Sequence, residues 1–146
     1  MSGWSRRTVM ALAAGFALPA SAEAQSVLVP PRGSPLRTAL LDAFRASVSA
    51  RIGGPVEFEV SALRVLRDWA YVSARPRRPG GAPIDWAATP FAEAMRADAM
   101  SDLTLGLLRR SGGAWRVVET AIGPTDVAWI DWIARHRAPR AVFSDE

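Results

Sequence analysis

The side chains that could carry acid–base or nucleophilic chemistry are few in kind. The chain of 146 residues has no cysteine and one histidine, His136, and all 18 of its basic residues are arginine. Without cysteine there is no thiol nucleophile, thiolate zinc site or redox pair, and without lysine there is no Schiff base or Walker motif. Neither a Gly-x-Ser-x-Gly elbow nor an EF-hand spacing occurs. Apart from His136, only carboxylates and a tyrosine remain for acid–base catalysis. No carboxylate cluster has metal-ligand spacing, so no metal or cofactor is predicted.

Three arginines open a segment rich in proline and glycine. Arg75, Arg77 and Arg78 begin the stretch 75–90, which we predict to be irregular. Guanidinium groups bind carboxylates and phosphates, and Trp86 could anchor an apolar part of a ligand beside them. The segment therefore predicts a contact with an anion or acidic polymer. The structural alternative is a solvated loop that covers a sheet edge.

Two tryptophans one turn apart mark a helix near the C-terminus. The turn 123–126 leads into it, Trp129 and Trp132 lie on it, and Pro139 follows its end. Tryptophans at this spacing usually pack on a sheet, whereas exposure of both would indicate a patch for a partner. His136 lies in the last turn, where a cation suits the helix dipole. The other apolar residues of this helix are Val127, Ile130 and Ile133.

The most regular element is an amphipathic helix at 34–52. Ser34 and Pro35 suit its N-cap and first position, and Gly53-Gly54-Pro55 ends it. Between these signals apolar residues recur every four positions, at Leu36, Leu40, Phe44, Val48 and Ile52. This period predicts a helix with one face packed on another element.

That other element is predicted to be an antiparallel sheet that begins with a hairpin. The run 56–60 alternates apolar and acidic residues, and beyond Ser61 the apolar positions change parity, which predicts a bulge or bend. Arg67-Asp68 can turn the chain into a strand at 69–74.

A second hairpin is predicted at 103–122, with its turn at Ser111-Gly112-Gly113. We expect its apolar residues to share the face toward the long helix, namely Leu105, Leu107, Trp115 and Val117. Together the patterns predict an α+β fold, in which one long N-terminal helix packs on a four-stranded antiparallel sheet. A short middle helix, from Thr89 to Met100, and the Trp-rich C-terminal helix complete it.

Residues 1–24 have the features of a cleavable export signal. Arg6-Arg7 precede an uncharged apolar run at 9–20, which is shorter than the roughly 20 residues of a spanning helix. The paired arginines resemble a twin-arginine signal. We therefore predict a periplasmic or secreted protein with no transmembrane segment after cleavage, a lead-in at 25–33, one domain at 34–143 and a tail at 144–146. The net charge of +4 is too small to indicate a nucleic-acid partner.

Several segments resemble small exported bacterial proteins of unassigned activity: Trp-Ala-Tyr-Val at 69–72, Gly-Ala-Pro-Ile-Asp-Trp at 81–86, Leu-Leu-Arg-Arg at 107–110 with Trp-Arg-Val-Val-Glu at 115–119, and Ile-Gly-Pro-Thr-Asp-Val at 122–127. The helix followed by hairpins, with a Gly turn leading into Trp-Arg-Val, is similar to cystatin-like and nuclear-transport-factor-like folds. That likeness implies an apolar pocket between helix and sheet that holds one or two acids or a tyrosine. The residues that could supply it are Asp85, Asp126, Asp131 and Tyr71, with Trp69 and Trp86 as walls.

Two functions are compatible with these patterns. The first is a non-enzymatic binding or interaction module at the cell envelope, whose partner is an envelope protein or an anionic polymer. The alternative is a small pocket enzyme, a hydrolase or isomerase that uses carboxylate acid–base chemistry. Fold likeness does not choose between them, because such folds host both.

Overall fold

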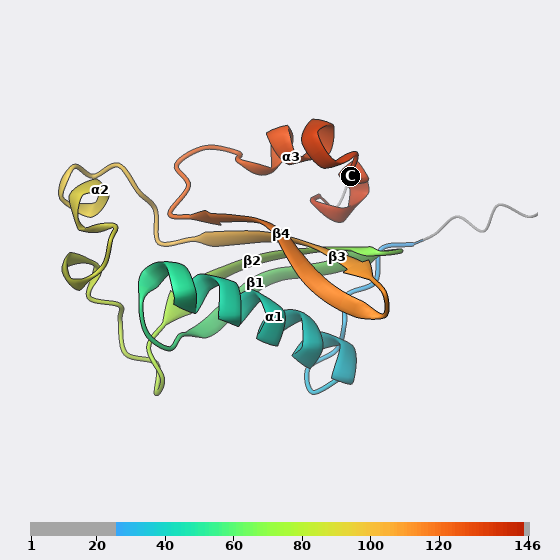
Figure 1. Cartoon of the computed structure of the whole chain (residues 1–146), viewed down its shortest axis with the longest axis horizontal. Helices are drawn as coiled ribbons and strands as arrows, with labels where there is room; N and C mark the ends of the chain where they lie inside the picture. The colour runs from blue at the N-terminus through green and yellow to red at the C-terminus, as the bar shows by residue number, and fades with distance from the viewer. Residues whose placement is uncertain (1–25, 145–146) are drawn as a thin grey trace, which may run out of the picture.

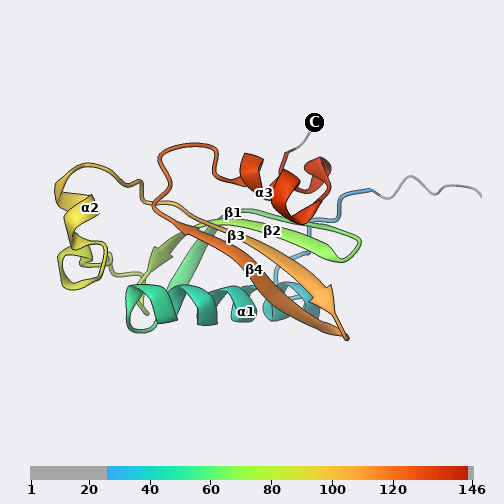
Figure 2. The same ribbon diagram turned by 45° about the horizontal axis from the view of Figure 1, so that its top comes forward.

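The computed structural model describes residues 26–144 and has three layers (Figure 1). A four-stranded sheet is the central layer, with α1 (Pro35–Ile52) on one face and α3 (Trp129–His136) on the other (Figures 1 and 2). The α+β fold that the sequence predicts is confirmed. The predicted export signal, residues 1–24, lies outside the described residues.

Helix α1 begins and ends at the predicted residues. The Ser34 hydroxyl accepts a hydrogen bond from the Arg37 amide at 3.3 Å, and Pro35 is the first helical residue. At the other end Gly53 adopts φ 84°, and its amide donates to the Ser49 carbonyl at 2.9 Å. The buried stripe is the predicted one, because Leu40, Phe44, Val48 and Ile52 are each at most 1% exposed.

The sheet consists of two consecutive hairpins in the order β1-β2-β3-β4, and all neighbours are antiparallel. Its strands are β1 (Glu57–Leu66), β2 (Trp69–Arg77), β3 (Thr104–Ser111) and β4 (Ala114–Ile122). The predicted bulge is present between Val60 and Ala62, where the Ser61 hydroxyl donates to the Ser73 carbonyl at 2.9 Å. Because of this bulge Val60 and Leu63 both pack on the α1 side.

Both predicted turns are confirmed. Arg67 adopts φ 54° in the turn between β1 and β2, and Gly112 and Gly113 adopt φ 60° and 79° between β3 and β4. Two-residue turns with positive φ match the right-handed twist of the strands that they join. The first turn also contacts β3, because the Arg110 amide donates to the Asp68 carbonyl at 2.8 Å.

The expected face of the second hairpin was wrong for half of its residues. Trp115 and Val117 pack on the α1 side, but Leu105 and Leu107 pack on the opposite side with Trp132. The physical reason is the two-residue turn, which places Trp115 opposite Arg110 and Val117 opposite Leu108, so that Leu105 and Leu107 point to the other face. A register shift between Leu107 and Leu108 changes the parity of β4 only beyond Val117, from Glu119 onward. Since both faces of the sheet are covered, apolar residues on either face are buried.

The second face is completed by the C-terminal residues after α3. Val142 and Phe143, at the end of the 3-10 helix η2 (Arg140–Val142), are 0% and 4% exposed. The Phe143 ring stacks on Trp129 at 5.3 Å between centroids and meets Tyr71 edge-on at 5.2 Å. These residues close a second core that is separate from the one under α1.

The segment between the hairpins is partly more regular than predicted and partly less. Strand β2 continues through Pro76 to Arg77, so Arg75 and Arg77 lie in a strand and not in the predicted irregular segment. The proline is tolerated although it cannot donate a ladder hydrogen bond. After the loop come the 3-10 helix η1 (Trp86–Ala88) and α2 (Ala92–Arg96), which is shorter than the expected helix from Thr89 to Met100. Asp98, at φ 53°, follows its end.

Candidate functional site

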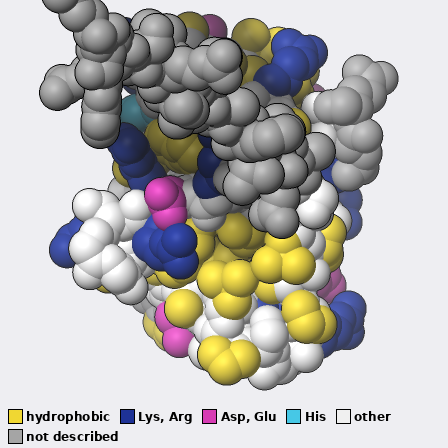
Figure 3. Space-filling view, turned by 90° about the vertical axis from the view of Figure 1, so that its right-hand side faces the viewer, with side chains coloured by type: hydrophobic (Ala, Val, Ile, Leu, Met, Phe, Trp, Pro, Cys, Tyr) yellow, Lys and Arg dark blue, Asp and Glu magenta, His cyan; other side chains and the backbone are white. Residues whose placement is uncertain are grey.

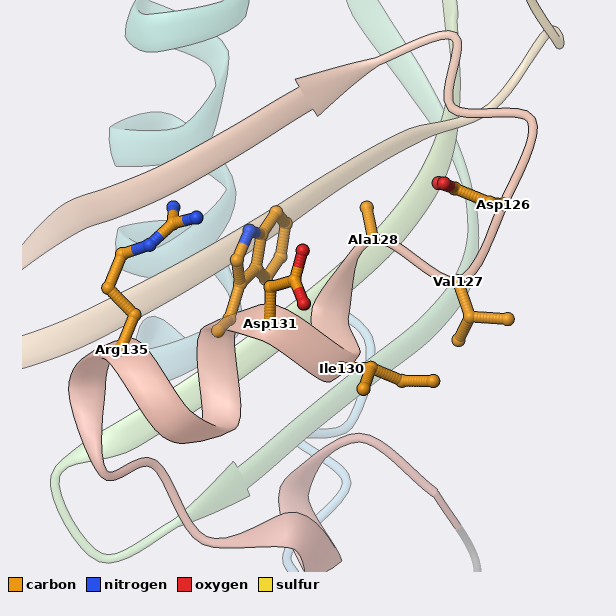
Figure 4. A pocket seen from close by; sticks show the side chains of 7 residues that line it. Asp126, Val127, Ala128, Ile130, Asp131 and Arg135 are labelled. Carbon is orange, nitrogen blue, oxygen red and sulfur yellow. The ribbon is translucent and has the colours of Figure 1, made fainter.

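A groove of about 450 Å³ lies beside the first turns of α3. The loop that joins β4 to α3 forms one wall, and α3 itself forms the other (Figure 4). The groove brings together three residues that the sequence singled out separately, Asp126, Asp131 and Trp132. Its other lining residues are Val127, Ala128, Ile130 and Arg135.

The loop wall is held in place by residues that precede β3. The amide of Gly123 donates to the Leu103 carbonyl at 2.8 Å, and the Ser101 hydroxyl donates to the Pro124 carbonyl at 2.6 Å. Gly123 has φ 66°, and a Cβ there would lie 2.6 Å from Met100 Cε. Glycine is therefore required at this turn, both for its positive φ and for the close approach of Met100.

The groove is negatively charged because its two carboxylates are unpaired while its arginine is not. Within residues 26–144, neither Asp126 nor Asp131 has a hydrogen bond or an ion pair from another side chain. Arg135 lies on the same helix as Asp131, but its guanidinium donates to Glu119 Oε1 at 2.6 Å. A ligand with a positive charge would therefore find two free acceptors here.

Apolar surface borders these carboxylates. Val127 and Ile130 are 50% and 53% exposed, and Figure 4 shows both side chains pointing outward from the loop and helix. Trp132, in contrast, is 4% exposed and belongs to the core behind the groove. Exposed branched side chains next to unpaired acids offer a partner both apolar area and hydrogen-bond acceptors.

Glu119 and His136 form a second polar contact on the same side of the sheet. His136 Nε2 lies 2.8 Å from Glu119 Oε1, the atom that also accepts from Arg135. Partial burial acts to raise the pKa of the Glu119 carboxyl, but the hydrogen bonds from His136 and Arg135 outweigh it and hold that pKa below its ordinary value. Because Glu119 is stabilised as an anion, it is a poor general acid. Its contacts with Arg135 and His136 join β4 to α3, and we call this set of contacts the Glu119 clamp.

The three arginines of the predicted anion site each make contacts within the chain. Arg75 donates to Asp102 at 2.7 Å and Arg77 to Glu59 at 3.2 Å. Arg78 donates to two backbone carbonyls just after α1, those of Gly53 at 2.9 Å and Pro55 at 3.0 Å. Trp86 meets Phe91 edge-on at 6.1 Å and packs on the α1 core. These contacts account for the three arginines and the tryptophan without a ligand.

The residues predicted for catalysis are not gathered around one cavity. Tyr71 is 5% exposed in the core under α3, where burial raises the pKa of its hydroxyl. Asp85 is exposed and caps η1 by accepting from the Ala87 amide at 3.2 Å. Asp126 and Asp131 line the open groove. Trp69, expected as a pocket wall, lies under the Arg109 guanidinium at 5.0 Å.

Sequence reasoning missed two features of this region. It counted Val127 and Ile130 among the apolar residues of the helix, but Val127 precedes the eight-residue helix, Ile130 is exposed, and Trp132 is the residue that the helix buries. It also gave Glu119 no partner. The signal for Glu119 was present, since an acid that follows two valines in a strand requires a cationic partner when it is partly buried.

Comparison of the chain with known protein families, with characterised proteins and with solved structures gives no match. The resemblance to cystatin-like and nuclear-transport-factor-like folds therefore stays a prediction. Within residues 26–144, no helix is long and apolar enough to cross a bilayer, and no three acidic or histidine side chains gather as metal ligands would.

Proposed function

We propose that the protein is a non-enzymatic binding module at the cell envelope that holds a basic, partly apolar segment of a partner protein in the α3 groove. The observation that carries this proposal is the pairing of two free carboxylates, Asp126 and Asp131, with the exposed side chains of Val127 and Ile130. The export signal predicted at residues 1–24 supports the location.

The charge of the groove favours a cationic segment. Asp126 is on the loop and Asp131 is on the helix, so an arginine or lysine side chain that enters the groove meets a carboxylate on each wall. Arg135 does not compete, because Glu119 holds it. An anionic polymer would meet unpaired negative charge here, so an envelope protein is the better partner for this site.

The apolar part of the groove favours a peptide segment over a free cation. Val127 and Ile130 are each about half exposed, and burial of apolar area is the main source of affinity in such contacts. The loop wall is pinned through Gly123 and Pro124, so little conformational freedom is lost on binding.

The alternative of a small pocket enzyme receives no support from the side-chain positions. Acid–base catalysis needs a titratable group inside a cavity, with a pKa shifted toward neutrality. The pKa of the Glu119 carboxyl is shifted downward, away from neutrality. Tyr71 is enclosed by Phe143 and other core residues, and it does not line the groove.

The proposal can be tested with a short peptide of alternating arginine and leucine, titrated into the isotopically labelled protein. We expect amide shifts concentrated at residues 123–135. Asp126→Asn with Asp131→Asn should weaken binding of the peptide about tenfold, because two exposed ion pairs of up to about 1 kcal/mol each are lost. A peptide of alternating glutamate and leucine should leave these amides unchanged.

A matched control changes the same charge elsewhere. Glu57→Gln with Glu93→Gln removes two exposed carboxylates that do not line the groove. This variant should bind the arginine–leucine peptide as well as the natural chain does. Equal weakening of peptide binding in both double variants, or amide shifts spread over the whole surface, would show that the peptide responds only to net charge. Either result would contradict binding in the groove.

A further inference from the structure

The end of the sheet that carries both hairpin turns has a row of side chains across three strands. Trp69 in β2 pairs with Arg109 in β3, which pairs in turn with Arg116 in β4. Residues directly opposite each other in antiparallel strands point to the same face. Figures 1 and 2 both show the two turns at the same end of the molecule.

Two like charges therefore lie directly opposite each other. Arg109 and Arg116 are both exposed, and directly paired like charges destabilise a sheet. Within residues 26–144, neither guanidinium has a carboxylate within ion-pairing distance. Asp68, the acid in the adjacent turn, is paired instead with Arg110 at 2.9 Å. The Arg109–Arg116 pair thus has no counter-charge from these residues, and an external anion could supply one.

We propose that this end of the sheet docks on an anionic phospholipid surface, with Arg109 and Arg116 binding lipid phosphates. Guanidinium groups recognise phosphate oxygens through paired hydrogen bonds, and one phosphate between two cross-strand arginines would relieve their repulsion. Arg67, exposed in the neighbouring turn, adds a further charge at the same end. Arginines on β3, on β4 and in the first turn match an array of headgroups better than they match a single free phosphate.

Aromatic and aliphatic side chains at the same end favour a lipid surface over another polyanion. Trp69 is half-buried beside Arg109, and tryptophan suits the boundary between headgroups and acyl chains. Leu28, which is 50% exposed, pairs with Val65 in β1 close to the first turn, and the next residue, Val29, is 63% exposed. Figure 3 views this end and shows basic side chains around an area of hydrophobic ones.

The proposed surface is independent of the groove at α3. Strand β4 starts at the hairpin turn with Ala114 and ends at Ile122, and the groove follows its far end (Figure 1). Six residues of strand, roughly 20 Å, separate Arg116 from the start of the loop that carries Asp126. Docking through the turns would leave the groove open, so either proposal can fail without the other.

Co-sedimentation with lipid vesicles tests the docking. The full chain is mixed with vesicles of phosphatidylcholine alone or of phosphatidylcholine with phosphatidylglycerol, and the ratio of the two partition constants is measured. This ratio removes any contribution of apolar segments, which bind both kinds of vesicle. Because one basic residue near an anionic surface contributes about fivefold, Arg109→Gln with Arg116→Gln should lower the ratio about 25-fold.

The matched control is Arg75→Gln with Arg77→Gln, which removes the same net charge from arginines that are already paired with Asp102 and Glu59. We expect the ratio to fall less than threefold. A natural chain without preference for anionic vesicles would overturn the proposal, and so would equal losses in the two double variants. Release by millimolar inorganic phosphate at constant ionic strength would also overturn it, since a single free phosphate would then suffice. Circular dichroism of each variant should match the natural chain, because the four arginines are surface residues.

Discussion

The Phe44 ring of α1 lies against the Cα of Gly106 in β3, so closely that a Cβ on Gly106 would be 2.4 Å from Phe44 Cε2. On its other side the ring stacks on Phe58 of β1 at 4.9 Å between centroids. Phe44 is completely buried, so it has no open space into which it could move. The absence of a side chain at Gly106 therefore sets how closely α1 approaches the sheet.

We expect Gly106→Ala to lower the free energy of unfolding by about 1–3 kcal/mol, because the added methyl group overpacks a filled core. Urea unfolding followed by circular dichroism measures the change. Phe44→Leu in the Gly106→Ala background should recover part of the loss, since it shortens the side chain that collides. If the two substitutions were simply additive, the contact would not be the cause.

The Glu119 clamp predicts a loss of stability in acid. Its folded-state pKa lies below the ordinary value of 4.5, so the unfolded chain binds more protons between the two values. The contribution of Glu119 is then complete above pH 4.5 and is lost as the pH falls through the lower folded pKa. Glu119→Gln should cost about 1.5 kcal/mol at neutral pH, the usual value of a hydrogen bond to a charged group.

Urea unfolding at pH 7 and pH 3 separates this effect from general acid denaturation. The difference in unfolding free energy between the natural chain and Glu119→Gln should shrink at pH 3. Glu57→Gln, which alters an exposed carboxyl on β1, serves as the control and should show a difference near zero at both values. A Glu119→Gln difference that did not depend on pH would contradict the clamp.

Phe143 should be as important for stability as a residue of the central core. It is 4% exposed and contacts Tyr71, Trp129 and Trp132. We expect Phe143→Ala to cost about 3–5 kcal/mol, as for other buried aromatic residues. Thermal unfolding followed by tryptophan fluorescence reports the loss. Ile130→Ala, at a side chain that is 53% exposed, should change the free energy by less than about 1 kcal/mol.

Thr104 offers a stabilising substitution. It is 0% exposed, and its hydroxyl has no hydrogen-bond partner among the described residues. A buried hydroxyl without a partner costs about 1–3 kcal/mol, and valine has nearly the same shape. Thr104→Val should therefore raise the midpoint of urea unfolding. Thr125→Val, at an exposed position, should leave it within experimental error, and a destabilised Thr104→Val would indicate a partner for the hydroxyl.

The groove was only partly predictable from the sequence. Asp126, Asp131 and Trp132 were recognised as unusual residues, but their convergence depends on the loop held by Gly123 and Ser101, which are more than 20 residues apart. The Arg109–Arg116 pair could have been predicted from the sequence, since a two-residue turn at Gly112-Gly113 dictates which residues lie opposite each other. The partner of Arg75 could not be predicted, because Asp102 lies beyond the loop that joins the two hairpins, whereas Glu59, the partner of Arg77, is in the paired strand of the same hairpin.

The sequence by itself determined the features that depend on local physical chemistry. The limits of α1 follow from Ser34, Pro35 and Gly53, and the bulge at Ser61 follows from a change in apolar parity. Only the tertiary structure decided which face each residue of β3 and β4 occupies and that Phe143 belongs to a core. A sheet covered on both faces buries apolar residues on either side, so alternation alone cannot assign a face. That assignment depends on the packing of α1 and α3 and, beyond Val117, on the register shift at Leu107.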